Sequence, residues 1–181
     1  YEEQVLQLEA IAGTEKIGLD MDTFLRSDKN LREHNFVINY LIENLKFFNI
    51  SNYKKGELKV KEFGNIAHLC TLINAEVNKM CPFLLLEKLH PSPAVCGFPK
   101  EKALEYLDVL ENFERGNYAS PFGWVDEEGN SDFRVALRGA RIINNEIVLI
   151  AGSGLVKGSI CEKEIDEIKL KFSSLVNLIF D

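Results

Sequence analysis

The sequence predicts an α+β fold in which layered antiparallel sheets pack against helices. Strand-like and helix-like segments occur in runs and not in the regular alternation of a doubly wound fold. The chain has 181 residues, of which 46% are hydrophobic and 27% charged, values typical of a soluble globular domain and not of a disordered chain or a coiled coil. No linker rich in Pro, Gly or Ser divides the sequence, so we expect residues 1–181 to form a single unit.

The elements are predicted from the spacing of apolar residues and from the residues that end each segment. Loose alternation predicts the first strand, which we expect to end in a turn at Gly13. Tyr1 reads as the middle of a strand, which suggests that the chain is a fragment. Apolar residues at three- and four-residue steps predict a long amphipathic helix, entered from Asp22 or Ser27. In chain order, the predicted elements are a strand at residues 5–11, a helix at 24–48, strand segments at 58–77, helices at 82–89 and 99–110, strands at 118–125, 133–143 and 147–151, and a helix at 161–180.

The remaining boundaries follow from prolines and from changes of hydrophobic period. β-Branched residues predict the strand segments that follow a polar loop at residues 51–56. Pro91 ends one short helix and Pro99 begins the next. Further on the period changes to two, and tight turns at residues 127–130 and 144–145 separate three strands. We expect these strands to form one antiparallel meander.

Composition and charge exclude several functional classes. The formal net charge is -7 and the sequence pI is about 5.1, so the chain is a poor candidate for binding nucleic acid or an anionic membrane. No apolar run approaches the roughly 20 residues that span a bilayer. The cysteines lack C-x-x-C spacing, which favours reduced thiols and a cytoplasmic location; they are Cys70, Cys81, Cys96 and Cys161.

The last predicted helix carries a charged face. Glu164, Glu167 and Lys171 follow one another at helical spacing, so their side chains project from one side. One interpretation is a solvated stripe with a Glu–Lys ion pair one turn apart. The alternative is a hard-cation site in which the two carboxylates hold Mg²⁺, directly or through its water, while Lys171 holds a substrate carboxylate.

Two turns of small residues could approach an anion closely, because their backbone N–H groups are not screened by large side chains. The first contains Gly13 and Thr14, and the second contains Gly152 and Gly154. Neither matches a phosphate-binding or dinucleotide-binding fingerprint, and taken alone each is consistent with an ordinary turn after a strand.

Three further residues have open interpretations. Arg138 is predicted to lie in the middle of a strand, where it either faces solvent or forms a planar clamp for a carboxylate. His68 lies in a predicted strand and, without further information, reads as a core histidine. Glu33 lies on the long first helix and becomes a candidate cation ligand only if a distant helix supplies partner carboxylates.

Taken together, the motifs resemble one family, the chorismate-utilising enzymes, and among them the isochorismate synthases most. The resemblance runs over nearly the whole chain, and the motifs occur in the family's order. They are Glu9-Ala10-Ile11-Ala12-Gly13-Thr14, Lys29-x-x-x-Glu33-His34, Ile66-x-His68-Leu69, His90-Pro91-Ser92-Pro93-Ala94-Val95-x-Gly97-Phe98-Pro99, Phe113-Glu114-Arg115-Gly116-x-Tyr118, Val135-Ala136-Leu137-Arg138, Ala151-Gly152-Ser153-Gly154 and Glu164-x-x-Glu167-x-x-x-Lys171.

The resemblance implies the C-terminal part of a large α+β catalytic domain and a Mg²⁺-dependent reaction of chorismate. In that reaction a water-derived hydroxyl enters at C2 of the ring and the C4 hydroxyl leaves. The glutamates that match Glu33 and Glu167 ligate Mg²⁺ in the family, and the one that matches Glu164 assists, often through water. The metal binds the ring carboxylate and stabilises charge as it develops on the ring.

The resemblance also implies a set of substrate-binding residues. Positions that match Gly152, Gly154 and Lys171 lie near the substrate carboxylates, and those that match Tyr118 and Arg138 hold the enolpyruvyl carboxylate. Gly13 and Thr14 match residues beside the entering or departing hydroxyl, and His68 matches a pocket histidine. The resemblance thus favours the carboxylate clamp and the cation site over the structural interpretations of these residues.

The family's general base, a lysine, and its general acid, a glutamate, lie on strands that precede the motif of Glu9. We therefore expect this polypeptide alone to lack the proton-transfer pair. The motif of Glu9 to Thr14 favours the water-using branch over anthranilate or aminodeoxychorismate synthases, and salicylate synthase is the nearest alternative. A non-catalytic binding module is the alternative of a different class. We expect chorismate as the only partner, no nucleic acid or membrane, and a monomeric intact protein, with a product that feeds quinone, siderophore or salicylate synthesis.

Overall fold

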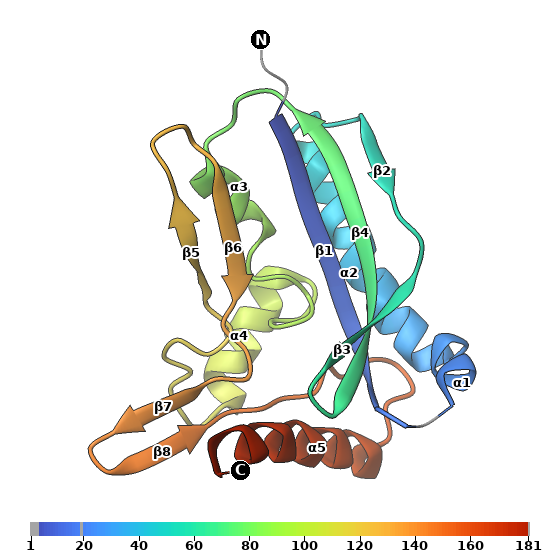
Figure 1. The fold of residues 1–181 in the computed structure, drawn as a ribbon, viewed down its shortest axis with the longest axis vertical. Coiled ribbons are helices and arrows are strands. Elements are labelled where there is room, and N and C mark those ends of the chain that lie inside the picture. The colour runs from blue at the N-terminus through green and yellow to red at the C-terminus, as the bar shows by residue number, and fades with distance from the viewer. Residues whose placement is uncertain (1–3, 19, 181) are drawn as a thin grey trace.

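The computed structural model describes residues 4–18 and 20–180, and Figure 1 shows how their helices and strands are arranged. Tyr1, which we expected to lie within a strand, falls outside these residues. The chain runs through β1 (Gln4–Lys16), α1 (Met21–Leu25), α2 (Asp28–Phe47), β2 (Tyr53–Lys55), β3 (Lys59–Phe63), β4 (Ile66–Val77), α3 (Pro82–Leu89), α4 (Lys100–Leu110), β5 (Pro121–Val125), β6 (Ser131–Val135), β7 (Ala140–Ile143), β8 (Glu146–Leu149) and α5 (Cys161–Phe180). Antiparallel sheets and helices in runs confirm the predicted α+β class.

The largest sheet is built on the long antiparallel pair of β1 and β4. Their register runs from Gln4 opposite Val77 to Lys16 opposite Ile66, and β2 and β3 pair with the other edge of β4. The predicted strand segments between residues 58 and 77 are therefore the hairpin of β3 and β4, and the predicted loop before them contains the short strand β2.

Helix α2 covers one face of this sheet and forms the core with it (Figure 1). Val37, Ile38, Leu41 and Leu45 face the sheet at the helical spacing that the sequence predicted, and each is at most 6% exposed. Burial of side chains of this size stabilises the domain by roughly 1.5–3 kcal/mol each. The helix thereby fixes the position of every other side chain that it carries, Glu33 included.

The N-terminal boundaries differ from the prediction in two places. The chain does not turn at Gly13: β1 continues to Lys16, and the register shifts between Ala12 and Thr14 as a β-bulge. A bulge accepts a glycine at positive φ without ending the strand, and Gly13 has φ 77°. The predicted single helix is also divided into α1 and α2, because the Ser27 side chain accepts from the Asn30 N–H and caps a new helix there.

The predicted three-stranded meander is wrong. β5 pairs only with β6 and β7 only with β8 within residues 4–18 and 20–180, so two separate hairpins replace it. The expected strand at residues 133–143 breaks between Val135 and Ala140, where Arg138 adopts a left-handed conformation with φ 55°. Arg138 is therefore a turn residue and not a mid-strand residue, and Tyr118 likewise precedes β5 in a turn.

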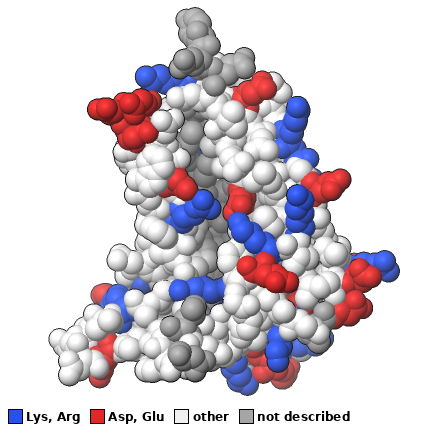
Figure 2. Space-filling view, viewed as in Figure 1, with Lys and Arg blue, Asp and Glu red and all other residues white. Residues whose placement is uncertain are grey.

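The hairpins and α5 surround the face of the sheet that α2 leaves open (Figure 1). Arg134 on β6 reaches Glu9 on β1 at 3.8 Å, and Glu9 also pairs with Lys61 on β3 at 2.9 Å. Figure 2 shows that the surface is hollowed between the β5–β6 hairpin and the β1–β4 sheet, with basic and acidic side chains along its sides. Among the helices that the structure describes, none is long and apolar enough to cross a membrane.

Candidate functional site

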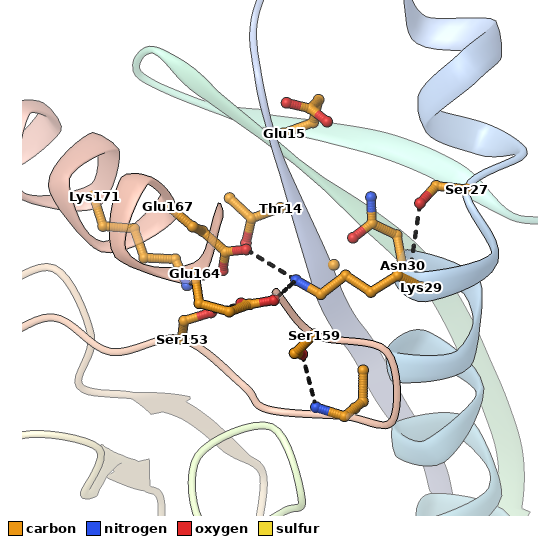
Figure 3. Close-up of polar contacts among 12 residues, drawn as sticks. Thr14, Glu15, Ser27, Lys29, Asn30, Ser153, Ser159, Glu164, Glu167 and Lys171 are labelled. Atoms are coloured by element: carbon orange, nitrogen blue, oxygen red, sulfur yellow. Dashed lines mark hydrogen bonds and ion pairs between the residues drawn. The ribbon is translucent and has the colours of Figure 1, made fainter. Parts of the chain in front are cut away.

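The charged face of α5 meets the first turn of α2 in a compact ionic cluster (Figure 3). Lys29 Nζ lies 2.8 Å from Glu164 Oε1 and 3.4 Å from Glu167 Oε2. The two carboxylates are nearly buried, with side chains 6% and 10% exposed. Burial alone would raise the pKa of Glu164, but hydrogen bonds from Lys29, Ser153 and Ser159 lower it below its usual value. Glu164 is therefore held as a carboxylate.

Glu33 points toward the same cluster from α2, one helical turn after Lys29. Burial is the main cause that raises the pKa of its carboxyl group; the charge of Glu167 raises it further, while a hydrogen bond from the Gly13 backbone opposes the shift. Glu33 Oε2 is buried and has no hydrogen-bond partner in the described part of the chain. A methyl group added to the Gly154 Cα would lie 3.3 Å from Glu33 Oε1, so the backbone of that turn passes close to the carboxylate because it has no side chain there.

These carboxylates suit a divalent cation by their chemistry. Mg²⁺ prefers carboxylate oxygen ligands, takes one or two from the protein and keeps several waters. The buried and unpartnered Glu33 Oε2 is an oxygen that such an ion would satisfy. Within residues 4–18 and 20–180, no three carboxylate, imidazole or thiol groups are already arranged as a ligand set. Lys29 contacts both Glu164 and Glu167.

His68 connects the bulge of β1 to Arg138. Its Nδ1 lies 2.9 Å from the Gly13 carbonyl oxygen and 3.2 Å from Thr14 Oγ1, and its Nε2 contacts the Arg138 guanidinium. Burial, followed by the charge of Arg138, lowers the pKa of His68 to about 4, against the opposing hydrogen bond to Gly13. The imidazole is therefore neutral at pH 7 and can orient Arg138 without repelling it.

Arg138 also lies against an aromatic ring. Its Cζ is 5.6 Å from the ring centroid of Phe63, at the end of β3, and the Phe63 ring is 5.7 Å from that of His68. Burial lowers the pKa of Arg138, yet a guanidinium remains charged at neutral pH. The result is a cation that a ring and an imidazole hold in place, as a planar clamp for a carboxylate requires.

Lys171 and Tyr118 meet at the second small-residue turn. Lys171 Nζ donates to the Gly152 carbonyl oxygen and to Glu167 Oε1, both at 2.8 Å. The Tyr118 hydroxyl oxygen lies 3.3 Å from the position that a Cβ of Gly152 would occupy. The Glu–Lys ion pair proposed from sequence is thus present, but it is largely buried, with side chains 10% and 18% exposed, and is not a solvated stripe.

The structure brings all of the predicted site residues into one connected set. The Gly13 backbone hydrogen-bonds with both Glu33 and His68, and the backbone at Gly154 lies close to Glu33. The Gly152 carbonyl oxygen accepts from Lys171, and the backbone there lies close to the Tyr118 hydroxyl. The sequence analysis assigned no role to Lys29, Ser153 or Phe63. Lys29 had a usable signal, because it precedes Glu33 by one helical turn and so shares its face. Phe63 had none, because its contact with Arg138 joins the end of β3 to a turn that is distant in sequence.

Fold and site together define an α+β domain in which buried glutamates and lysines lie near an arginine held by a histidine and an aromatic ring. Comparison with known proteins is more specific. The family described as "Chorismate binding enzyme" matches residues 1–180, and the chain belongs to this family.

Several similar proteins are isochorismate synthases. The chain is 37% identical over 174 residues to the salicylate biosynthesis isochorismate synthase of Pseudomonas aeruginosa, which covers 92% of this chain and 37% of that protein. MenF, the menaquinone-specific isochorismate synthase of Escherichia coli, superposes with a TM-score of 0.82 at 30% identity, over 97% of this chain and 42% of that one. DhbC from Bacillus anthracis superposes with a TM-score of 0.89 at 28% identity, over 97% and 49%. The chain thus spans less than half the length of these relatives, and its fold is that of the corresponding part.

Proposed function

We propose that this chain forms the cation-binding and carboxylate-binding part of an isochorismate synthase. The whole enzyme would convert chorismate into isochorismate: a water-derived hydroxyl enters at C2 of the ring and the C4 hydroxyl leaves. The observation that carries the proposal is that Lys29 on α2 contacts both Glu164 and Glu167 on α5, while Glu33, one turn further along α2, interacts electrostatically with Glu167, Lys29 and Lys171. Chorismate carries two carboxylates, and a site with two cationic side chains and a metal position complements that charge.

Arg138 and Tyr118 would hold the enolpyruvyl carboxylate in this proposal. The guanidinium is fixed by His68 and the Phe63 ring, so binding would cost little further side-chain ordering. Lys171 lies within the same set and would act as a point charge toward a substrate carboxylate. Gly13 and Thr14 would lie beside the reacting hydroxyl positions, with His68 as a neutral hydrogen-bonding group next to them.

Glu33 and Glu167 would hold the Mg²⁺, and Glu164 would assist, in part through water. When bound, the ion would act as a Lewis acid on the ring carboxylate and withdraw charge from the ring. The protein's own contribution is to keep the nearly buried Glu164 side chain ionised. For Glu164 the hydrogen bonds from Lys29 and Ser153 do this.

We further propose that this chain alone does not complete the reaction. In the family, the base lysine and the acid glutamate precede the motif of Glu9, so in the whole enzyme both would lie outside residues 1–181. This chain would then bind substrate and metal without completing turnover. A mixture of this chain with chorismate and Mg²⁺ should therefore not reach the full rate of isochorismate formation.

We also propose that the intact protein is a monomer in the cytoplasm, where its cysteines, all free among the described residues, stay reduced.

Calorimetry tests the proposal directly. Chorismate is titrated into the protein with and without Mg²⁺, and the same is done for Glu167→Gln and Asp166→Asn. Asp166 is the matched control, because it is the neighbouring carboxylate on α5 and its side chain is 73% exposed. We expect Mg²⁺ to tighten chorismate binding in the parent and in Asp166→Asn, and Glu167→Gln to weaken that binding about tenfold or more.

An isotherm that Glu167→Gln leaves unchanged would instead favour a non-catalytic module. Salicylate synthase remains the second candidate, because Tyr118 and Leu137 also suit the branch that eliminates pyruvate. The products of the intact protein separate the two: isochorismate alone supports the first proposal, and salicylate with pyruvate supports the second.

A further inference from the structure

Lys29 is the charged group of the cluster for which no role was predicted from sequence. It lies in the first turn of α2, and its side chain is 24% exposed. Its ammonium contacts Glu164 at 2.8 Å and Glu167 at 3.4 Å, and Glu33 lies close enough to interact with it electrostatically. Figure 3 shows the lysine extending from α2 to both carboxylates of α5. The Lys29 ammonium therefore interacts with the same carboxylates that are proposed to hold Mg²⁺.

This arrangement has an electrostatic reason. Glu164 and Glu167 lie one turn apart on α5 and are both nearly buried, so their charges repel each other in a medium that screens poorly. A positive charge between them removes most of that repulsion. It also links the start of α2 to α5, elements that are 138 residues apart in the chain at this contact.

A divalent ion would require the same oxygen atoms. An ammonium at 2.8–3.4 Å from the carboxylates would also repel a second cation placed within a few ångströms of it. Lys29 and a metal ion therefore compete for the carboxylates, and only one of them can hold both glutamates closely. The lysine side chain is long and partly exposed, so it can move toward solvent without a change in the backbone.

We infer that Lys29 is a positioning residue of the metal site: it holds Glu164 and Glu167 in place without metal, and releases at least one of them when a divalent cation binds. The inference rests on the proposed function, because it needs these glutamates to bind a cation. It predicts a site that binds Mg²⁺ weakly by itself, yet keeps its carboxylates in position for the ion.

The test is Mg²⁺ binding by calorimetry, without chorismate, to the parent protein and to Lys29→Met, Lys29→Arg and Lys169→Met. Methionine keeps the length of the side chain and removes the charge, whereas arginine keeps the charge. Lys169→Met is the matched control, since it removes an exposed lysine that pairs with Asp166 on the same helix. We expect the dissociation constant for Mg²⁺ to fall about tenfold in Lys29→Met, and to stay near the parent value in Lys29→Arg and Lys169→Met.

Thermal unfolding provides a second readout. Without metal, Lys29→Met should unfold at a lower temperature than the parent, because its carboxylates lose their counter-charge. The same saturating Mg²⁺ concentration should raise the unfolding temperature of Lys29→Met more than that of the parent, because stabilisation by a ligand grows with the logarithm of its concentration divided by the dissociation constant.

Unchanged or weaker Mg²⁺ binding in Lys29→Met would overturn this inference. Glu167→Gln separates that failure from failure of the proposed function. If Glu167→Gln abolishes Mg²⁺ binding while Lys29→Met does not tighten it, the metal site stands and the role of Lys29 is wrong. If Glu167→Gln has no effect on Mg²⁺ binding either, the site itself is wrong and both proposals fail.

Discussion

His68 donates a hydrogen bond from Nδ1 to the Gly13 carbonyl oxygen at 2.9 Å, and this contact follows from the group on the other side of the ring. A guanidinium can only donate hydrogen bonds, so the contact of Arg138 with Nε2 requires that nitrogen to accept. The proton of the neutral ring is then on Nδ1 and points to Gly13. The backbone N–H of Gly13 in turn donates a hydrogen bond to the Glu33 carboxyl group. The bulge at Gly13 thus joins the carboxylate side of the site to its arginine side.

Gly13→Ala should damage both sides together. The residue has φ 77°, and an added Cβ would lie 3.1 Å from the Asn30 Cβ and 3.3 Å from the Asn30 carbonyl oxygen at the start of α2. Left-handed strain for an alanine costs about 1–2 kcal/mol, and the crowded contact adds to it. We expect the free energy of unfolding, measured with urea, to fall by about 2–3 kcal/mol.

Gly129→Ala is the control for this substitution. Gly129 has φ 87° in the β5–β6 turn, and nothing lies within 4 Å of the position of its Cβ. Gly129→Ala should therefore show only the cost of the left-handed backbone strain. Its free energy of unfolding should fall less than that of Gly13→Ala, and its affinity for chorismate should not change. Equal losses in the two variants would mean that the contact with Asn30 contributes nothing.

A fall in pH should lower the free energy of unfolding even at pH values above the range in which carboxylates titrate. His34 is 1% exposed and bonds Thr71 through Nε2 at 2.8 Å. Burial, followed by the charge of Lys55, lowers the pKa of His34 to about 4, and burial is also the main reason that the pKa of His68 is about 4. Burial lowers the pKa of His90 as well.

In the unfolded chain histidines titrate near about 6.5. As the pH falls from there toward 4, the unfolded state binds protons that the native state excludes, so the free energy of unfolding decreases. For His34 and His68 the limiting slope is about 1.4 kcal/mol per pH unit each. Compared with pH 7.5, urea unfolding should show a free energy of unfolding about 0.7 kcal/mol lower at pH 6.5 and about 2.7 kcal/mol lower at pH 5.5, for the two histidines together. Constant stability over the whole range would show that these histidines take up protons as readily in the folded protein as in the unfolded chain.

The site was predictable from sequence where regular structure places the residues. The 3.6-residue period puts Glu164, Glu167 and Lys171 on one side of α5 whatever the rest of the chain does. Glu33 could be paired with them only through the family motifs, because contacts between α2 and α5 depend on tertiary packing. Apolar spacing likewise predicted which face of α2 enters the core.

The sequence analysis failed where one residue departs from regular backbone geometry. Residues 133–143 alternate as a strand should, and nothing in that pattern marks the left-handed conformation of Arg138, which is uncommon for a residue other than glycine. Gly13 was read as a turn because a glycine after a strand usually is one, whereas a bulge needs the partner strand β4 to define it. Both departures lie in the site, where they aim a backbone or side-chain group at a neighbour.

Phe63 should set the strength of the arginine clamp. Its ring lies 5.6 Å from Arg138 Cζ, and the residue is 36% exposed; a cation–π contact contributes about 0.5–2 kcal/mol. Phe63→Leu removes the ring and leaves Arg138 freer to move, so the dissociation constant of chorismate with Mg²⁺ should rise about threefold to tenfold. Phe63→Tyr keeps the ring and should bind chorismate like the parent, while Mg²⁺ binding without chorismate should be the same in all three proteins. Weaker Mg²⁺ binding in Phe63→Leu, or equal loss of chorismate affinity in both variants, would mean that Phe63 supports the hairpin of β3 and β4 and not the guanidinium.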